Sequence, residues 1–140
     1  MRVTFAHLCD YALISNDGKL SLIGITDTLF VPALPFNYPS FAIAFQIELN
    51  HAEINREFPM RLDIMGPDGE VLLRMEAKGA VQGTPRVGTK TRFGQVVTAQ
   101  GVQFKTEGPH SVNIWLDGRP EQPIEFAVSV HKPVPAGPTK

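Results

Sequence analysis

Residues 41–50 read Phe-Ala-Ile-Ala-Phe-Gln-Ile-Glu-Leu-Asn. A large apolar side chain occupies every second position of this stretch, and Ala, Gln, Glu and Asn occupy the positions between. Successive side chains of a β-strand point to opposite faces, so this spacing gives a strand one fully apolar face, whereas a helix would scatter the same residues around its circumference. The stretch therefore predicts a strand that packs one face into a core.

The same two-residue alternation recurs in four later segments and defines the predicted core. Turn residues that tolerate positive φ separate the segments at Asn16-Asp17-Gly18, Pro67-Asp68-Gly69 and Asp117-Gly118, as hairpins between antiparallel strands require. About eight strands are expected, near 2–10, 19–31, 40–50, 58–66, 70–80, 93–104, 110–117 and 123–131. The predicted core residues are Phe41, Ile43, Phe45, Ile47, Leu49, Met60, Leu62, Ile64, Val71, Leu73, Met75, Ala77, Val112, Ile114, Leu116, Ile124, Phe126, Val128 and Val130.

About eight half-apolar strands cannot bury their faces as one open sheet, and no long amphipathic helix is present to cover them. The second layer must be another sheet. The predicted fold class is all-β, an antiparallel two-sheet β-sandwich of immunoglobulin-like or jelly-roll-like type over residues 1–131, with a closed or partly open barrel as the alternative. Asn50 and Glu53 resemble a helix cap, but Pro59 limits any helix there to a turn or two. Residues 132–140 are rich in proline and are expected to form a flexible tail.

The composition of the chain is that of a globular protein without a membrane span. With 43% hydrophobic and 19% charged residues among 140, the chain is an ordinary globular one. Its formal net charge of −1 provides no global attraction to nucleic acid or anionic lipid. The single cysteine, Cys9, cannot form an internal disulfide, which favours the reducing cytoplasm. No stretch approaches the roughly 20 apolar residues of a membrane span, and no cofactor is expected.

The N-terminal motifs resemble those of a family of short bacterial proteins of unknown function. These motifs are Asp10-Tyr11-Ala12, the turn Asp17-Gly18-Lys19-Leu20 and the strand step Ile23-Gly24. The hairpin at Asp68-Gly69-Glu70 and the one from 108 to 118 fit the same layout. The resemblance implies a β-fold and a bacterial origin, and it carries no functional residue over to this chain.

Trp115 is the first candidate for a binding residue. Val112, Ile114 and Leu116 fix the inward face of its strand, so parity places Trp115 on the opposite face. An exposed tryptophan is a frequent anchor in protein interfaces. The alternatives are that Trp115 packs under a loop, or that a bulge resets the alternation.

The segment from Ala77 to Thr106 is the second candidate. It contains Lys78, Arg86, Lys90, Arg92 and Lys105 and no acidic residue, a local charge of +5. Arg86, Lys90 and Arg92 are candidate contacts for an anion, an acidic partner or nucleic acid. The alternative is a solvated loop with a charged edge strand that resists aggregation.

No catalytic or metal-binding motif is recognisable. The four histidines, His7, His51, His110 and His131, show no metal-ligand spacing, although His7 and Cys9 share one face of the first strand, a face that Val3 and Phe5 also occupy at the edge of the core. The preferred hypothesis is a non-enzymatic, cytoplasmic module that binds an unknown protein partner or itself. The rivals are a small hydrolase whose site assembles from separate strands, and an anion- or nucleic-acid-binding protein that uses the basic segment.

Overall fold

The computed structural model describes residues 1–130, which form eleven strands and one three-residue 3₁₀ helix. A three-stranded sheet has the order β1-β5-β8, and a six-stranded sheet has the order β4-β11-β9-β6-β7 with β10 beside β9. Strands β2 and β3 form a separate hairpin. The bounds are β1 Arg2–Cys9, β2 Tyr11–Ile14, β3 Leu20–Ile23, β4 Thr28–Val31, β5 Phe36–Asn50, β6 Phe58–Met65, β7 Val71–Gly79, β8 Lys90–Phe104, β9 Gly108–Leu116, β10 Arg119–Pro120 and β11 Ile124–Val130.

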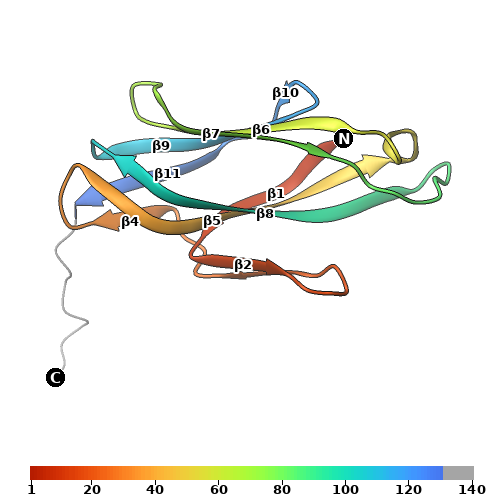
Figure 1. Ribbon diagram of the computed structural model, residues 1–140, viewed down its shortest axis with the longest axis horizontal. Coiled ribbons are helices and arrows are strands. Elements are labelled where there is room, and N and C mark those ends of the chain that lie inside the picture. The colour runs from red at the N-terminus through yellow and green to blue at the C-terminus, as the bar shows by residue number, and fades with distance from the viewer. Residues whose placement is uncertain (131–140) are drawn as a thin grey trace.

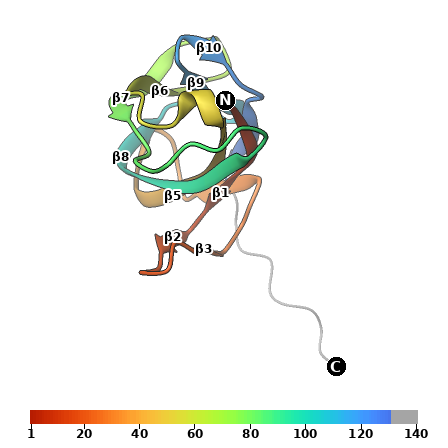
Figure 2. The same ribbon diagram turned by 90° about the vertical axis from the view of Figure 1, so that its right-hand side faces the viewer.

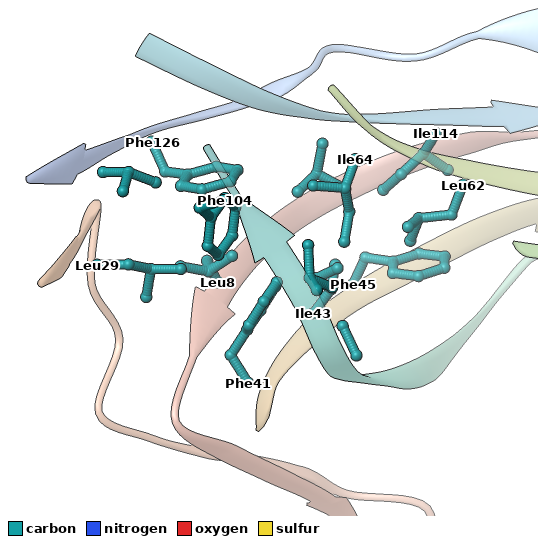
Figure 3. Packing of buried hydrophobic residues seen from close by; sticks show 14 of the residues in the cluster. Leu8, Leu29, Phe41, Ile43, Phe45, Leu62, Ile64, Phe104, Ile114 and Phe126 are labelled. Atoms are coloured by element: carbon teal, nitrogen blue, oxygen red, sulfur yellow. The ribbon is translucent and has the colours of Figure 1, made fainter. Parts of the chain in front are cut away.

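The two larger sheets lie face to face, with the hydrophobic core between them (Figure 1). Side chains of β5 and β8 point toward those of β6, β9 and β11, as Figure 3 shows for Phe45, Leu62 and Ile114. All five apolar residues predicted from segment 41–50 are buried, and so are Leu62, Ile64, Val112, Ile114, Leu116, Phe126 and Val128. The alternation therefore identified most of the core correctly, and the all-β, largely antiparallel architecture is confirmed.

The predicted turns occur where the sequence places them. Gly18, Gly69 and Gly118 have φ values of 83°, 82° and 79°, and Asp117 has 54°. A two-residue loop with positive φ at both positions matches the right-handed twist of the strands that it joins, which is why Asp117 and Gly118 connect β9 to β10. The short helix His51–Glu53 begins with the expected cap, since the Asn50 side chain accepts a hydrogen bond from Ala52 N and the Glu53 carboxylate accepts one from Asn50 N.

The bounds of one predicted strand and the purely antiparallel pairing are corrected. The expected strand 19–31 is divided into β3 and β4 by a turn. In this turn the Thr26 hydroxyl donates a hydrogen bond to the Thr28 carbonyl oxygen and accepts one from the Thr28 backbone N–H. After this turn β4 pairs with β11 in parallel, with Leu29 opposite Val128, whereas the other pairs are antiparallel. The chain therefore adds β4 to the six-stranded sheet without a hairpin.

Strand β5 is buried on both faces. Ala42 and Ala44 point away from the main core, yet they are 2% and 0% exposed because the β2–β3 hairpin covers them (Figure 2). Ala12, Leu20 and Leu22 of the hairpin pack with them and with Cys9 and Val96 as a second apolar cluster. The hairpin thus forms a partial third layer on the outer side of the three-stranded sheet.

Three residues of the predicted core are exposed to solvent. Val71, Ala77 and Val130, which were predicted to belong to the core, are exposed, because β7 is an edge strand and β11 ends at Val130. The predicted proline-rich tail, 132–140, lies outside the described residues. Within residues 1–130, no helix has the length and apolar character that crossing a membrane requires.

Candidate functional site

Trp115 lies on the outer face of the six-stranded sheet. Burial along β9 alternates as its sequence predicts: Ile114 and Leu116 are each 1% exposed and face the core, whereas Trp115 is half-buried on the other side. No bulge interrupts the pairing of β9 with β6 around it. The indole is therefore a surface side chain held on a rigid strand.

Arg61 covers the indole ring. It lies directly opposite Trp115 in the pairing of β6 with β9, and its Cζ is 4.0 Å from the ring centroid. A guanidinium at this distance over an indole is attracted by the negative face of the ring. The stack fixes both side chains and leaves the guanidinium partly open to solvent, since 37% of the Arg61 side chain is exposed.

A buried carboxylate holds the arginines of this face in place. Asp63 is 1% exposed and accepts two hydrogen bonds from Arg74, at 2.9 Å from Nε to Oδ1 and 3.0 Å from Nη2 to Oδ2. Its Oδ2 is also 3.6 Å from Arg61 Nε, an ion pair too long for a hydrogen bond. Arg61 Nε is itself buried and has no hydrogen-bond partner among residues 1–130. Asp63 thus lies on the Nε side of the Arg61 guanidinium.

A cleft of about 540 Å³ lies beside this stack, a size within the range of binding pockets for small ligands. We call it the Trp115 cleft. Two cations, Arg61 and Lys78, and one carboxylate, Glu76, contribute to its wall, and Lys78 Nζ is 3.6 Å from Glu57 outside it. The lining residues are Pro59, Met60, Arg61, Glu76, Ala77, Lys78, Trp115 and Gly118.

Lys90 and Arg92, the other sequence candidates, converge on a buried carboxylate. Glu48 is 5% exposed; its Oε2 is 2.9 Å from Arg92, and its Oε1 is 3.6 Å from Lys90 and 3.1 Å from Arg2. Burial acts to raise the pKa of Glu48, but the hydrogen bond and charge of Arg2, with Lys90 and Arg92, lower that pKa by more, so it lies below its ordinary value. Both candidate cations therefore already have an anionic partner within the chain.

The four candidate residues do not form one site. Trp115 lies on the outer face of the six-stranded sheet, and Lys90 and Arg92 lie on the outer face of the three-stranded sheet. Arg86 is exposed in the loop between β7 and β8. Lys90 and Arg92 share one surface, but Lys78 of the same basic segment does not, because β7 and β8 belong to different sheets.

The histidines have structural surroundings. His110 is 4% exposed, its Nδ1 is 2.9 Å from the Gly108 carbonyl oxygen, and its ring packs against Phe104 and Phe126. His7 is exposed and stacks on Phe5, while Cys9 is buried under the hairpin, so the predicted packed position of His7 at the core edge is wrong. Over residues 1–130, no three His, Cys, Asp or Glu side chains gather as metal ligands. His131 lies outside that range.

An exposed apolar surface on the β2–β3 hairpin was not predicted from the sequence. Tyr11, Leu13 and Ile23 project from its outward face, and Ile25 follows in the next turn; they are 57%, 39%, 60% and 57% exposed. We call these four residues the hairpin surface. The sequence does contain a sign of this surface, because strand β3 has apolar residues on both faces: Leu22 packs inward and Ile23 points outward.

Comparison with curated proteins finds no match. A family model, described as a family of unknown function (DUF6941), matches residues 4–129, a range that begins in β1, ends in β11 and includes both the Trp115 cleft and the hairpin surface. This match spans nearly the whole chain, and the protein therefore belongs to the DUF6941 family.

Proposed function

We propose that this chain is a non-enzymatic protein-binding module whose binding site is the Trp115 cleft. The observation that carries the proposal is the Arg61–Trp115 stack beside that cleft, with the Cζ of Arg61 4.0 Å from the ring centroid. Tryptophan and arginine are among the residue types enriched at the positions that dominate binding in protein interfaces. The buried Asp63 orders Arg61 before any partner arrives, which lowers the entropy cost of binding.

The chemistry of the cleft favours an acidic segment of a partner. The guanidinium edge of Arg61 that Asp63 does not use presents donors in a fork suited to a carboxylate. Lys78 adds a second positive charge to the same wall, where the two cations outnumber the one carboxylate, Glu76. The indole and Met60 offer apolar surface next to these cations, so a carboxylate beside an apolar side chain fits both parts of the cleft.

The single tryptophan makes this proposal directly testable. Because Trp115 is the only tryptophan in the chain, its fluorescence reports on the cleft alone. The probe is a synthetic peptide of alternating Glu and Leu, and the matched control peptide has Lys in place of Glu. We expect saturable fluorescence changes with the acidic peptide, none with the basic peptide, and a loss of affinity of at least about tenfold in Arg61→Gln.

Arg86→Gln is the matched control variant, since it removes an exposed arginine outside the cleft. It should bind the acidic peptide as the wild-type protein does. Loss of binding in Arg86→Gln with none in Arg61→Gln would instead support anion binding through the basic segment. Equal binding of both peptides would refute recognition of a carboxylate at Trp115.

We also infer that the two larger sheets constitute an antiparallel β-sandwich, supported by the single core to which both contribute side chains. The buried, unpaired thiol of Cys9 supports a cytoplasmic protein, and the resemblance of its N-terminal motifs supports a bacterial one. These inferences are independent of the binding proposal.

A further inference from the structure

We infer that the hairpin surface is a contact between two copies of this chain, which pair reversibly about a two-fold axis. The surface lies on the β2–β3 hairpin, on the outer side of the three-stranded sheet (Figure 2). The Trp115 cleft belongs to the six-stranded sheet. The inference therefore does not rest on the function proposed above.

Packing within one copy does not account for the outward apolar residues. Ala12, Leu20 and Leu22 on the inner face already cover Ala42, Ala44 and Val96. Tyr11 and Ile23 lie opposite each other in the pairing of β2 with β3 and project away from that cluster, each more than half exposed. Adjacent exposed apolar side chains of this kind form a patch, and the largest apolar patch on a protein surface is often a functional one.

The distribution of charge favours a second copy as the occupant. The outward positions of the paired strands are Tyr11, Leu13, Ser21 and Ile23, none of which is charged. A two-fold contact brings a surface onto itself, so any charge near the axis would meet its own like charge. The charges at the hairpin turn neutralise each other, since Lys19 Nζ is 3.4 Å from Asp17 Oδ2.

The area is consistent with a weak dimer. At their observed exposures, the four side chains present at most roughly 400 Å² per copy, or roughly 800 Å² for the pair, below the roughly 1,200 Å² of stable interfaces. A dimer of this size dissociates on dilution.

Sedimentation velocity of the full chain over a wide concentration range tests the inference. We expect wild-type protein to shift reversibly between monomer and dimer. Ile23→Lys should raise the dissociation constant at least about tenfold, because it places a charge at the contact. The matched control is Val87→Lys, which adds the same charge at a valine that is 87% exposed in the β7–β8 loop and should leave the dimer unchanged.

A charge-swap experiment establishes whether the surface meets itself. Ile23→Lys and Ile23→Glu should each be monomeric, and their mixture should form a dimer. Circular dichroism checks that both variants fold, and Ile25→Lys provides a second disruptive variant. A wild-type chain that stays monomeric at every concentration, a dimer that survives Ile23→Lys, or a mixture that forms no dimer would each overturn the inference.

Trp115 fluorescence, measured on the same dilution series, distinguishes dimerisation through the hairpin surface from binding at the Trp115 cleft. Fluorescence of Trp115 should not change when the dimer dissociates, because the cleft and the hairpin belong to different sheets. A fluorescence change on dilution would place the contact at the cleft and refute the hairpin assignment.

Discussion

Asp63→Asn tests whether a buried charge orders the outer face of the six-stranded sheet. The substitution preserves the shape of the side chain and removes its charge. One carboxylate oxygen that accepts from Arg74 becomes an amide nitrogen, which places a donor against a donor at a position where the residue is 1% exposed. The Arg61 guanidinium, 3.6 Å away, loses its ionic partner at the same time.

The expected loss of stability is about 2 kcal/mol. Leaving a buried polar group without a suitable partner costs about 1–3 kcal/mol. The expected loss of stability does not exceed this range, because the side chains of Arg74 and Arg61 are 46% and 37% exposed. Water can therefore replace part of the interaction that they lose with Asp63. With a urea dependence of about 2 kcal/mol per molar for a chain of this size, the unfolding midpoint should fall by about 1 M.

Urea unfolding followed by Trp115 fluorescence measures this loss and the order of the stack together. The matched control is Glu57→Gln, another carboxylate-to-amide change, at a residue whose side chain is 65% exposed and pairs with Lys78. This control should change stability by less than about 0.5 kcal/mol. Equal midpoints for Asp63→Asn and Glu57→Gln would refute the idea that Asp63 organises this face.

Three further predictions follow from other buried groups. The folded chain holds the pKa of Glu48 below its usual value of 4.5. The ionised Glu48 side chain therefore contributes its full stabilisation above pH 4.5, and this contribution disappears as the pH falls through the lower folded pKa. Urea midpoints should fall more steeply on acidification in the wild type than in Glu48→Gln. Phe104→Ala should lower the free energy of unfolding by about 3–5 kcal/mol, whereas Val71→Ala at an exposed position should change it by less than about 0.5 kcal/mol, as measured by thermal or urea unfolding. Burial and the adjacent charge of Asp10 raise the pKa of the Cys9 thiol, so maleimide labelling near neutral pH should be slow in native protein and fast in urea; equal rates would contradict burial beneath the hairpin.

Periodicity predicted the parts of the fold in which one face is apolar and the other polar. Segment 41–50 is the clearest example, and Asp117-Gly118 shows that turn chemistry is equally readable. Strand β2 was not predicted, and β3 was merged with β4 because the turn between β3 and β4 has Gly24 alone as a turn signal and is closed by a threonine hydroxyl. Ala42 and Ala44 were assigned to an outward face, since alternation shows which side a residue is on but not what covers that side.

The sequence predicted individual residues of the candidate site but not the contacts between them. Parity placed Trp115 on the outer face, but Arg61 lies above it only because of the register between β6 and β9, which the sequence does not state. Likewise, the basic character of Lys90 and Arg92 was visible, while their common partner Glu48 was not, because the three residues meet across neighbouring strands.

The position of β11 has a consequence for how the protein is made. This strand fills the gap between β9 and β4, so the last strand of residues 1–130 completes a sheet that begins in the first quarter of the chain (Figure 1). Until the ribosome has released residues 124–130, β4 has no neighbour and the apolar faces of β6 and β9 remain incompletely covered. During synthesis these apolar faces should therefore remain open to non-native association until residues 124–130 can pair with β4 and β9.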